Sequence, residues 1–190
     1  MIRLGRRLRV RPRHGHRVLV LGGARSGKSA FAERLLAAAP AVTYVACGIL
    51  PDGADPEWAA RVSTHQARRP ASWTTQETRD LSAILRPAQP PALIDCLSSW
   101  LAGTMDDCGV WLDRPGADAE LARHVDELVI AWAASDRQLV AVSSEVGSGV
   151  VPATVSGRRY RDELGALNAR IAAGSDEVWL LVAGIPQRLR

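Results

Sequence analysis

The sequence predicts an α/β fold of three layers, in which helices cover both faces of a mostly parallel β-sheet. Short apolar stretches, typical of buried strands, alternate with helical patterns along the 190 residues. A glycine-rich octapeptide from Gly22 to Ser29 separates the first such stretch from a helical pattern, and another apolar stretch ends in Asp95. Because ligands bind at the carboxyl ends of strands in such sheets, we expect these two features and the turn at Ser144-Glu145 to share one edge.

Composition and charge indicate a single folded domain preceded by a basic extension. Residues 1 to 17 contain seven arginines and no acidic residue, so the net charge of +4 becomes −3 without them. We expect residues 1–16 to be a disordered extension and residues 17–190 to be one domain. The basic segment could contact nucleic acid or an anionic surface, but it has no aromatic residue to stack on bases, so a nucleic-acid partner is not expected.

Other features of composition argue against a membrane or secreted protein. No apolar run approaches the roughly 18 residues of a membrane span, and the basic N-terminus has no adjoining apolar segment. The three cysteines, Cys47, Cys96 and Cys108, show no metal-ligand spacing. They predict reduced, packed thiols in a cytoplasmic protein.

The first half of the chain begins with a strand over residues 17–21 that is apolar on both faces, as in the centre of a parallel sheet. A helix is predicted over 29–39 and a β-branched strand over 42–46. After a loop rich in glycine and proline, Asp55-Pro56-Glu57 has the capping pattern of a helix start, and this helix runs to about Arg68.

Residues 73–77 are ambiguous between strand and loop, and residues 80–86 look helical. A buried strand over 92–95 is followed by a helix over 97–105 and a loop over 106–116. The remaining elements are a helix over 118–134, a strand over 138–143, a helix over 155–173 and a last strand over 177–182.

The octapeptide Gly22 to Ser29 fits the phosphate-binding pattern G-x-x-x-x-G-K-[ST] in its required strand–loop–helix context. Its backbone N–H groups and the positive end of the following helix attract phosphate. Lys28, the only lysine of the chain, would reach the β- and γ-phosphates, and the Ser29 hydroxyl would hold Mg²⁺. The sequence therefore predicts a site for a nucleoside triphosphate.

Three further residues allow two interpretations each. Asp95 could bind the metal ion or cap the next helix, and the phosphate loop favours the metal. His65 shares a helix face with two arginines, and it could be a nucleophile among phosphate-binding groups, although spacing alone favours a solvated basic face. Glu77 could contact a ribose or a base, whereas pattern alone indicates a surface acid.

Several blocks occur in the order found in one known family. They are Gly22 to Ser29, Tyr44 to Ala46, Asp55 to Glu57, Arg61-Val62-x-x-His65, Arg69-Pro70 with Trp73, Leu93 to Leu97 with Trp100, Glu145 to Pro152, Arg161 to Asn168, and Asp176 to Val178. Through this ordered set, residues 17–190 resemble the bifunctional adenosylcobinamide kinase / adenosylcobinamide-phosphate guanylyltransferase family of cobalamin biosynthesis.

The resemblance implies a P-loop NTPase-type, RecA-like fold, a homotrimer and two reactions. Adenosylcobinamide, a corrinoid, is first phosphorylated with ATP or GTP, and the product then receives GMP from GTP through a guanylylated histidine. That histidine falls on His65, which reverses the interpretation from spacing alone, and Mg²⁺ falls on Ser29 and Asp95. The nucleotide-contacting positions fall on Gly22, Gly23, Ala24, Arg25, Ser26, Gly27, Lys28, Ser29, Ala46, Cys47, Gly48, His65, Gln66, Ala67, Arg68, Glu77 and Asp95.

Two other functions are compatible with a phosphate loop. One is a small-molecule kinase without the guanylyl step, and His65 distinguishes this alternative. The other is a GTP-dependent switch, against which stands the absence of an N-K-x-D motif, since the chain has a single lysine.

Ser144 stands where the family usually has Asn, and this departure generates a prediction. The change Ser144→Asn should leave kinase turnover unchanged or raise it, because it restores a longer polar group near the expected site. Initial rates of cobinamide phosphorylation measure the effect. A steep loss of rate would show that the turn at 144–145 is misplaced.

Overall fold

The computed structural model describes residues 15–48, 69–85 and 90–190. In these ranges, seven strands form one sheet. The strands are β1 (Arg17–Gly22), β2 (Val42–Ala46), β3 (Trp73–Glu77), β4 (Ala92–Asp95), β5 (Leu139–Ser144), β6 (Glu177–Val182) and β7 (Ile185–Arg188). The helices are α1 (Lys28–Leu36), α3 (Leu81–Leu85), α4 (Leu97–Asp107), the 3₁₀ helix η1 (Val110–Leu112), α5 (Ala117–Ala134) and α6 (Val155–Ala173).

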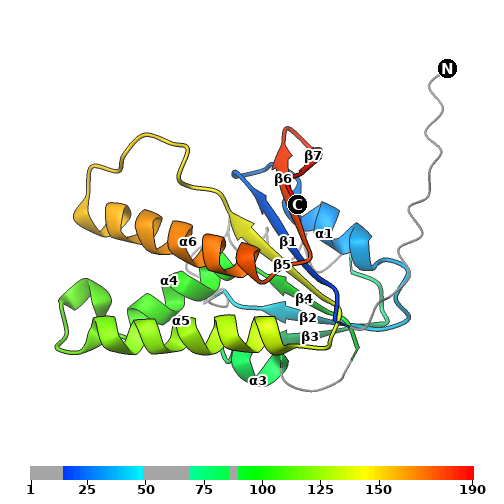
Figure 1. The fold of residues 1–190 in the computed structure, drawn as a ribbon, viewed down its shortest axis with the longest axis horizontal. Helices are drawn as coiled ribbons and strands as arrows, with labels where there is room; N and C mark the ends of the chain where they lie inside the picture. The colour runs from blue at the N-terminus through cyan, green and yellow to red at the C-terminus, as the bar shows by residue number, and fades with distance from the viewer. Residues whose placement is uncertain (1–14, 49–68, 86–89) are drawn as a thin grey trace.

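The strand order is β3-β2-β4-β5-β1-β6-β7 (Figure 1). Every neighbouring pair from β3 to β6 is parallel, and only β7 runs antiparallel to its neighbour β6. The predicted mostly parallel α/β sheet is thereby confirmed. The carboxyl ends of β1 to β5 consequently lie at the same edge, where the sequence placed the site.

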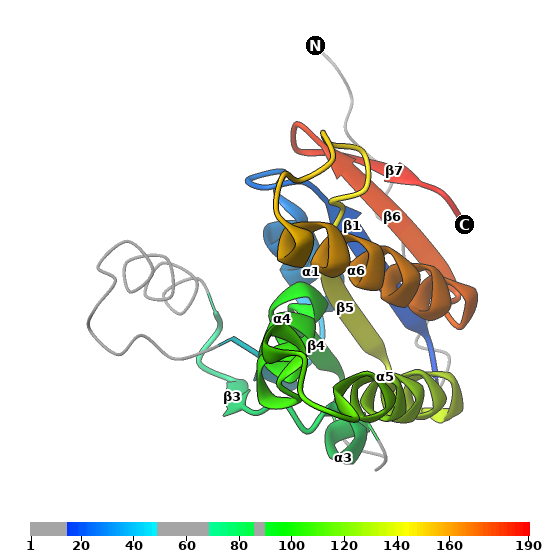
Figure 2. The same cartoon turned by 90° about the vertical axis from the view of Figure 1, so that its left-hand side faces the viewer.

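Helices cover both faces of this sheet, as predicted. Figure 2 shows α4, α5 and α6 on one face and α1 on the other. The alternation of side chains along β1 explains this division. Val18 and Val20 pack with Ala32 and Leu36 of α1, whereas Leu19 and Leu21 belong to the larger core under α3 to α6.

Most predicted elements agree with the structure to within three residues at each end. The ambiguous segment 73–77 is strand β3, paired with β2. The helix after the phosphate loop ends at Leu36 rather than 39, and the helix after Asp95 continues to Asp107. The segment expected to be a loop over 106–116 contains η1. The helix predicted over 57–68 lies outside the described residues.

The prediction that the strand over 177–182 is the last is wrong, because β7 follows it. Two residues connect β6 to β7, and both have positive φ: 50° at Ala183 and 80° at Gly184. Two such residues make the type I′ turn that favours tight hairpins. The usual signal for this turn is Asn-Gly or Asp-Gly, and alanine at the first position removes that signal from the sequence.

This turn yields a stability prediction. Replacing Ala183 by Asn should raise the free energy of unfolding by about 0.5–1 kcal/mol, because Asn tolerates left-handed backbone better than Ala. Urea unfolding followed by circular dichroism measures the change. The matched variant Ala183→Val should lower stability, since a β-branched residue is strained at positive φ. A destabilised Asn variant would contradict the role given to this turn.

Candidate functional site

The phosphate loop connects the carboxyl end of β1 to the first turn of α1. Arg25 and Gly27 have φ of 55° and 89°, so the backbone turns sharply before the helix begins. The N–H of Phe31 donates to the carbonyl of Gly27 at 2.9 Å, which closes the first helical turn. The loop therefore directs the N-terminal end of α1, with its free N–H groups, toward the carboxyl edge of the sheet.

Gly22 at the start of this loop has no room for a side chain. A Cβ atom there would lie 2.4 Å from Ser26 Oγ and 2.9 Å from the carbonyl oxygen of Leu181. The turn between β6 and β7 supports the loop from outside, because the N–H of Gly184 donates to the carbonyl of Ser26 at 3.1 Å. Packing against neighbouring strands thus fixes the shape of the loop.

Lys28 and Ser29 lie where the loop becomes helix. The ammonium of Lys28 donates to the carbonyl of Gly23 at 3.1 Å, which holds its charge across the loop. The hydroxyl of Ser29 donates to Asp95 Oδ1 at 3.4 Å. The structure thereby brings together the two residues expected to hold Mg²⁺. A hydroxyl and a carboxylate are the hard oxygen ligands that this ion prefers, so the pair fits it.

Two residues that were not assigned to the site lie behind Asp95: Tyr44 contacts the carboxylate, and Arg69 contacts Tyr44. The hydroxyl of Tyr44 in β2 donates to Asp95 Oδ2 at 2.8 Å. The guanidinium of Arg69 stacks on the Tyr44 ring, with Cζ 3.4 Å from the ring centroid, and donates to Thr75 Oγ1 at 3.0 Å. Both residues belong to blocks of the family resemblance, Tyr44 at the start of one and Arg69 before Pro70 in another, but neither block indicated a role at the site.

The Tyr44 hydroxyl remains protonated over the physiological pH range. Burial, followed by the nearby Asp95 carboxylate, raises its pKa above the ordinary value of a tyrosine. A protonated phenol can only donate toward the carboxylate, so it fixes the direction of this hydrogen bond. The two carboxylate oxygens of Asp95 consequently have different partners, Ser29 on one and Tyr44 on the other.

The end of β5 lies directly beside the phosphate loop. Ser144 is in register with Gly22, and the N–H of Glu145 donates to the Gly22 carbonyl at 3.0 Å. Ser144 Oγ is 3.2 Å from Ser98 Oγ, and its carbonyl accepts from Asn168 Nδ2 at 3.0 Å. The expectation that the turn at 144–145 shares an edge with the loop is confirmed.

The remaining residues that were expected to contact the nucleotide are distributed unevenly. Ala46 is in register with both Asp95 and Glu77, and Gly48 follows at the same edge. The Cys47 side chain is buried, and that burial raises the pKa of its thiol, so only its backbone faces the edge. Glu77 is exposed on β3, four strand positions and hence about 19 Å from β1. His65, Gln66, Ala67 and Arg68 lie outside the described residues.

Residues 18–189 match the model of the family described as cobinamide kinase / cobinamide phosphate guanyltransferase, CobU. The chain belongs to this family. Two curated relatives are named bifunctional adenosylcobalamin biosynthesis proteins. CobU of Salmonella typhimurium is 38% identical over 91% of this chain and 99% of its own length, and CobP of Pseudomonas aeruginosa is 39% identical over 92% and 97%.

Membership of the cobinamide kinase / guanyltransferase family confirms the resemblance found in the sequence. The chain is a bifunctional kinase and guanylyltransferase of cobalamin biosynthesis that uses nucleoside triphosphates. An ATPase of a type III secretion system shares the fold, with a TM-score of 0.53 at 14% identity, over 88% of this chain and 52% of that chain. None of the helices in the described ranges combines the length and apolar character needed to cross a membrane.

The contact between Tyr44 and Asp95 generates a prediction. Tyr44→Phe should lower kcat/KM for phosphoryl transfer about tenfold, the effect of losing a hydrogen bond to a carboxylate. It should also raise the Mg²⁺ concentration that gives half-maximal rate, because Asp95 is no longer oriented. Steady-state kinetics over a Mg²⁺ titration measure both effects.

The matched control for this prediction is Tyr160→Phe. The Tyr160 hydroxyl donates to the Ser98 carbonyl at 3.0 Å and makes no contact with Asp95, so its loss should leave the Mg²⁺ dependence unchanged. If Tyr44→Phe also left the Mg²⁺ dependence unchanged, Tyr44 would have only a packing role.

Proposed function

We propose that both reactions of this enzyme use nucleotide held at the carboxyl edge of β1, β2 and β4. The observation that carries this proposal is the contact of Ser29 with Asp95 directly after the phosphate loop. The backbone N–H groups of Gly22 to Ser29 and the ammonium of Lys28 would bind the β- and γ-phosphates. Ala46 to Gly48 would line the same edge beside Asp95.

Ser29 and Asp95 would hold Mg²⁺, which supplies positive charge against the phosphate oxygens when bound. Tyr44 would hold Asp95 in position for this task, through the 2.8 Å hydrogen bond to Oδ2. The other carboxylate oxygen, Oδ1, is the one that contacts Ser29.

In the kinase reaction, the aminopropanol hydroxyl of adenosylcobinamide would attack the γ-phosphorus of ATP or GTP. A bond forms between that oxygen and phosphorus, the bond from the γ-phosphorus to its bridging oxygen breaks, and a nucleoside diphosphate leaves. Lys28 and the loop would stabilise the negative charge that spreads over the phosphate oxygens, and they would align the reacting groups.

In the guanylyl transfer, a neutral nitrogen of His65 would attack the α-phosphorus of GTP. A nitrogen–phosphorus bond forms and pyrophosphate leaves; the corrinoid phosphate then takes the GMP and restores the imidazole. The supporting observation is the family membership, because the guanylylated histidine of the family falls on His65. Gln66, Ala67, Arg68 and Glu77 would contact the guanine nucleotide.

We further propose a homotrimer located in the cytoplasm, without a nucleic-acid partner. The family resemblance supports the trimer. The three cysteines support the location, because all are free thiols. Residues 17–190 would form one catalytic domain, with residues 1–16 as an extension outside it.

The decisive experiment is incubation with Mg²⁺ and GTP labelled at the α-phosphate, followed by denaturing gel electrophoresis and peptide mapping. The label should survive base, be lost in acid and map to the His65 peptide, as a phosphoramidate requires. His65→Ala should abolish labelling and guanylyl transfer while retaining most cobinamide phosphorylation. His14→Ala, a histidine of the basic extension, serves as the matched control and should label normally.

Guanylyl transfer that persisted in His65→Ala would refute the role of His65. Absence of α-label in the wild type, together with phosphorylation of cobinamide from γ-labelled nucleotide, would leave the kinase reaction alone and return His65 to an ordinary basic helix face.

A further inference from the structure

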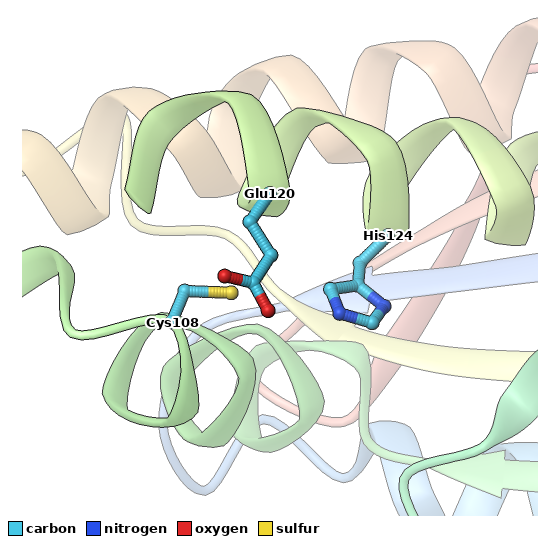
Figure 3. A group of neighbouring side chains, drawn as sticks. All are labelled: Cys108, Glu120 and His124. Atoms are coloured by element: carbon cyan, nitrogen blue, oxygen red, sulfur yellow. The ribbon is translucent and has the colours of Figure 1, made fainter. Parts of the chain in front are cut away.

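Three side chains capable of binding a metal meet at the far end of α4 from Asp95. Cys108 follows the last turn of α4, and Glu120 and His124 extend from α5 toward it (Figure 3). One ligand atom from each lies within 4.8 Å of the others. Because the 11 residues of α4 span about 16 Å, this cluster is separate from the nucleotide site.

We propose that Cys108, Glu120 and His124 bind a zinc ion. Thiolate, imidazole and carboxylate are all established zinc ligands, and three protein ligands leave a fourth position for water. The mixture of sulfur, nitrogen and oxygen favours zinc over Mg²⁺, which prefers oxygen ligands alone. Nothing in the proposed reactions uses these three residues.

The backbone already sets the spacing that such a site needs. Glu120 and His124 are four residues apart on α5, so their side chains leave the same face of the helix. Zinc–ligand bonds of about 2.0–2.3 Å place tetrahedral ligand atoms roughly 3.3–3.8 Å apart. The ligand atoms lie within 4.8 Å of one another, so rotation of the three side chains would bring them to this spacing.

Arg114 provides an outer layer of contacts around the cluster. Its Nη2 forms an ion pair with Glu120 Oε2, and its Nε donates to the Cys108 carbonyl at 2.7 Å. This leaves the second oxygen of Glu120 for a metal, with the carboxylate oriented by the arginine. A hydrogen-bonded partner behind a ligating carboxylate is a common feature of metal sites.

The partners of His124 are easily displaced. Arg123 Nη2 is 3.2 Å from Nε2, and Glu127 Oε2 is 3.9 Å from Nδ1. Both are exposed side chains that already pair with each other at 2.7 Å. A zinc ion could bind either ring nitrogen of His124. It would displace Arg123 from Nε2 or Glu127 from Nδ1, and the displaced side chain would keep its ion pair with the other.

Solvent can reach the cluster from the side of His124. A cavity of about 380 Å³ is lined by residues of α4 and α5 and by the start of α3, and His124 forms part of its wall. Asp80, Asp107 and Glu127 line the same cavity, with Arg79 as the one basic residue among its lining residues. The excess of carboxylates favours the approach of a cation.

The bound ion would join the end of α4 to the first two turns of α5 across the connection that contains η1. The Cys108 thiol would lose its proton to solvent when it coordinates, because thiolate is the ligand form. Zinc at this position would therefore restrain the two helices against each other, with its fourth position open to water.

The test uses the full-length protein, freed of metal with a chelator and held in excess Mg²⁺ to occupy the oxygen-ligand site. Isothermal titration with Zn²⁺ should show one saturable site per chain. Co²⁺ should give a thiolate charge-transfer band and the intense visible bands of a tetrahedral complex. Zn²⁺ should also raise the midpoint of thermal unfolding.

Cys108→Ser and His124→Gln should each weaken zinc binding about tenfold to a hundredfold. Cys108→Ser should also abolish the cobalt charge-transfer band. Asp126→Asn changes an exposed carboxylate on the same helix that pairs with Arg170 of α6, so it is the matched control and should retain both. His124→Gln lies on the helix surface, so it tests the site even if Cys108→Ser fails to fold.

Two results would overturn the proposal. One is the absence of saturable Zn²⁺ binding to the wild type in excess Mg²⁺. The other is unchanged zinc affinity in His124→Gln, which would place the ion elsewhere on the chain. Neither result bears on guanylylation of His65, so the two proposals fail independently.

Discussion

The central position of β1 is the constraint on which the site depends. The strand is buried on both faces and pairs with β5 and β6, so its last residue is enclosed on every side. Gly22 fits there because it has no side chain that would collide with its neighbours. Its carbonyl accepts a hydrogen bond from the N–H of Glu145. The phosphate loop that follows Gly22 therefore places Lys28 and Ser29 at the edge of the sheet where β4 ends.

Asp95 joins this loop to the rest of the sheet. It lies on β4, which β5 separates from β1, and contacts Ser29 of α1 on one side and Tyr44 of β2 on the other. In a partly buried site these hydrogen bonds reinforce one another, because the local dielectric is lower than in water. One carboxylate therefore connects β4 to α1 and β2, which come much earlier in the chain.

Features carried by neighbouring residues could be predicted from the sequence, whereas contacts between distant segments could not. The phosphate loop and the alternation of strands and helices are local patterns, and both predictions are confirmed. Tyr44 and Arg69 are 25 residues apart in the sequence, and no pattern indicates that one stacks on the other. The hairpin at Ala183 was missed because alanine rarely adopts the positive φ that it has there, so its residue type does not indicate a turn. The roles of His65 to Arg68 stay predictions.

The edges of the sheet have a consequence for how the folded protein behaves at high concentration. An unpaired edge strand is a template on which another chain can add a strand, which is a common route to aggregation. In the described part of the chain, β7 forms one edge, and Pro186 within it has no N–H to offer an incoming strand. At the opposite edge, β3 exposes Thr74 to Glu77, whose polar side chains offer no apolar surface to a second sheet. Each edge of the described sheet therefore carries one feature that disfavours the addition of another strand.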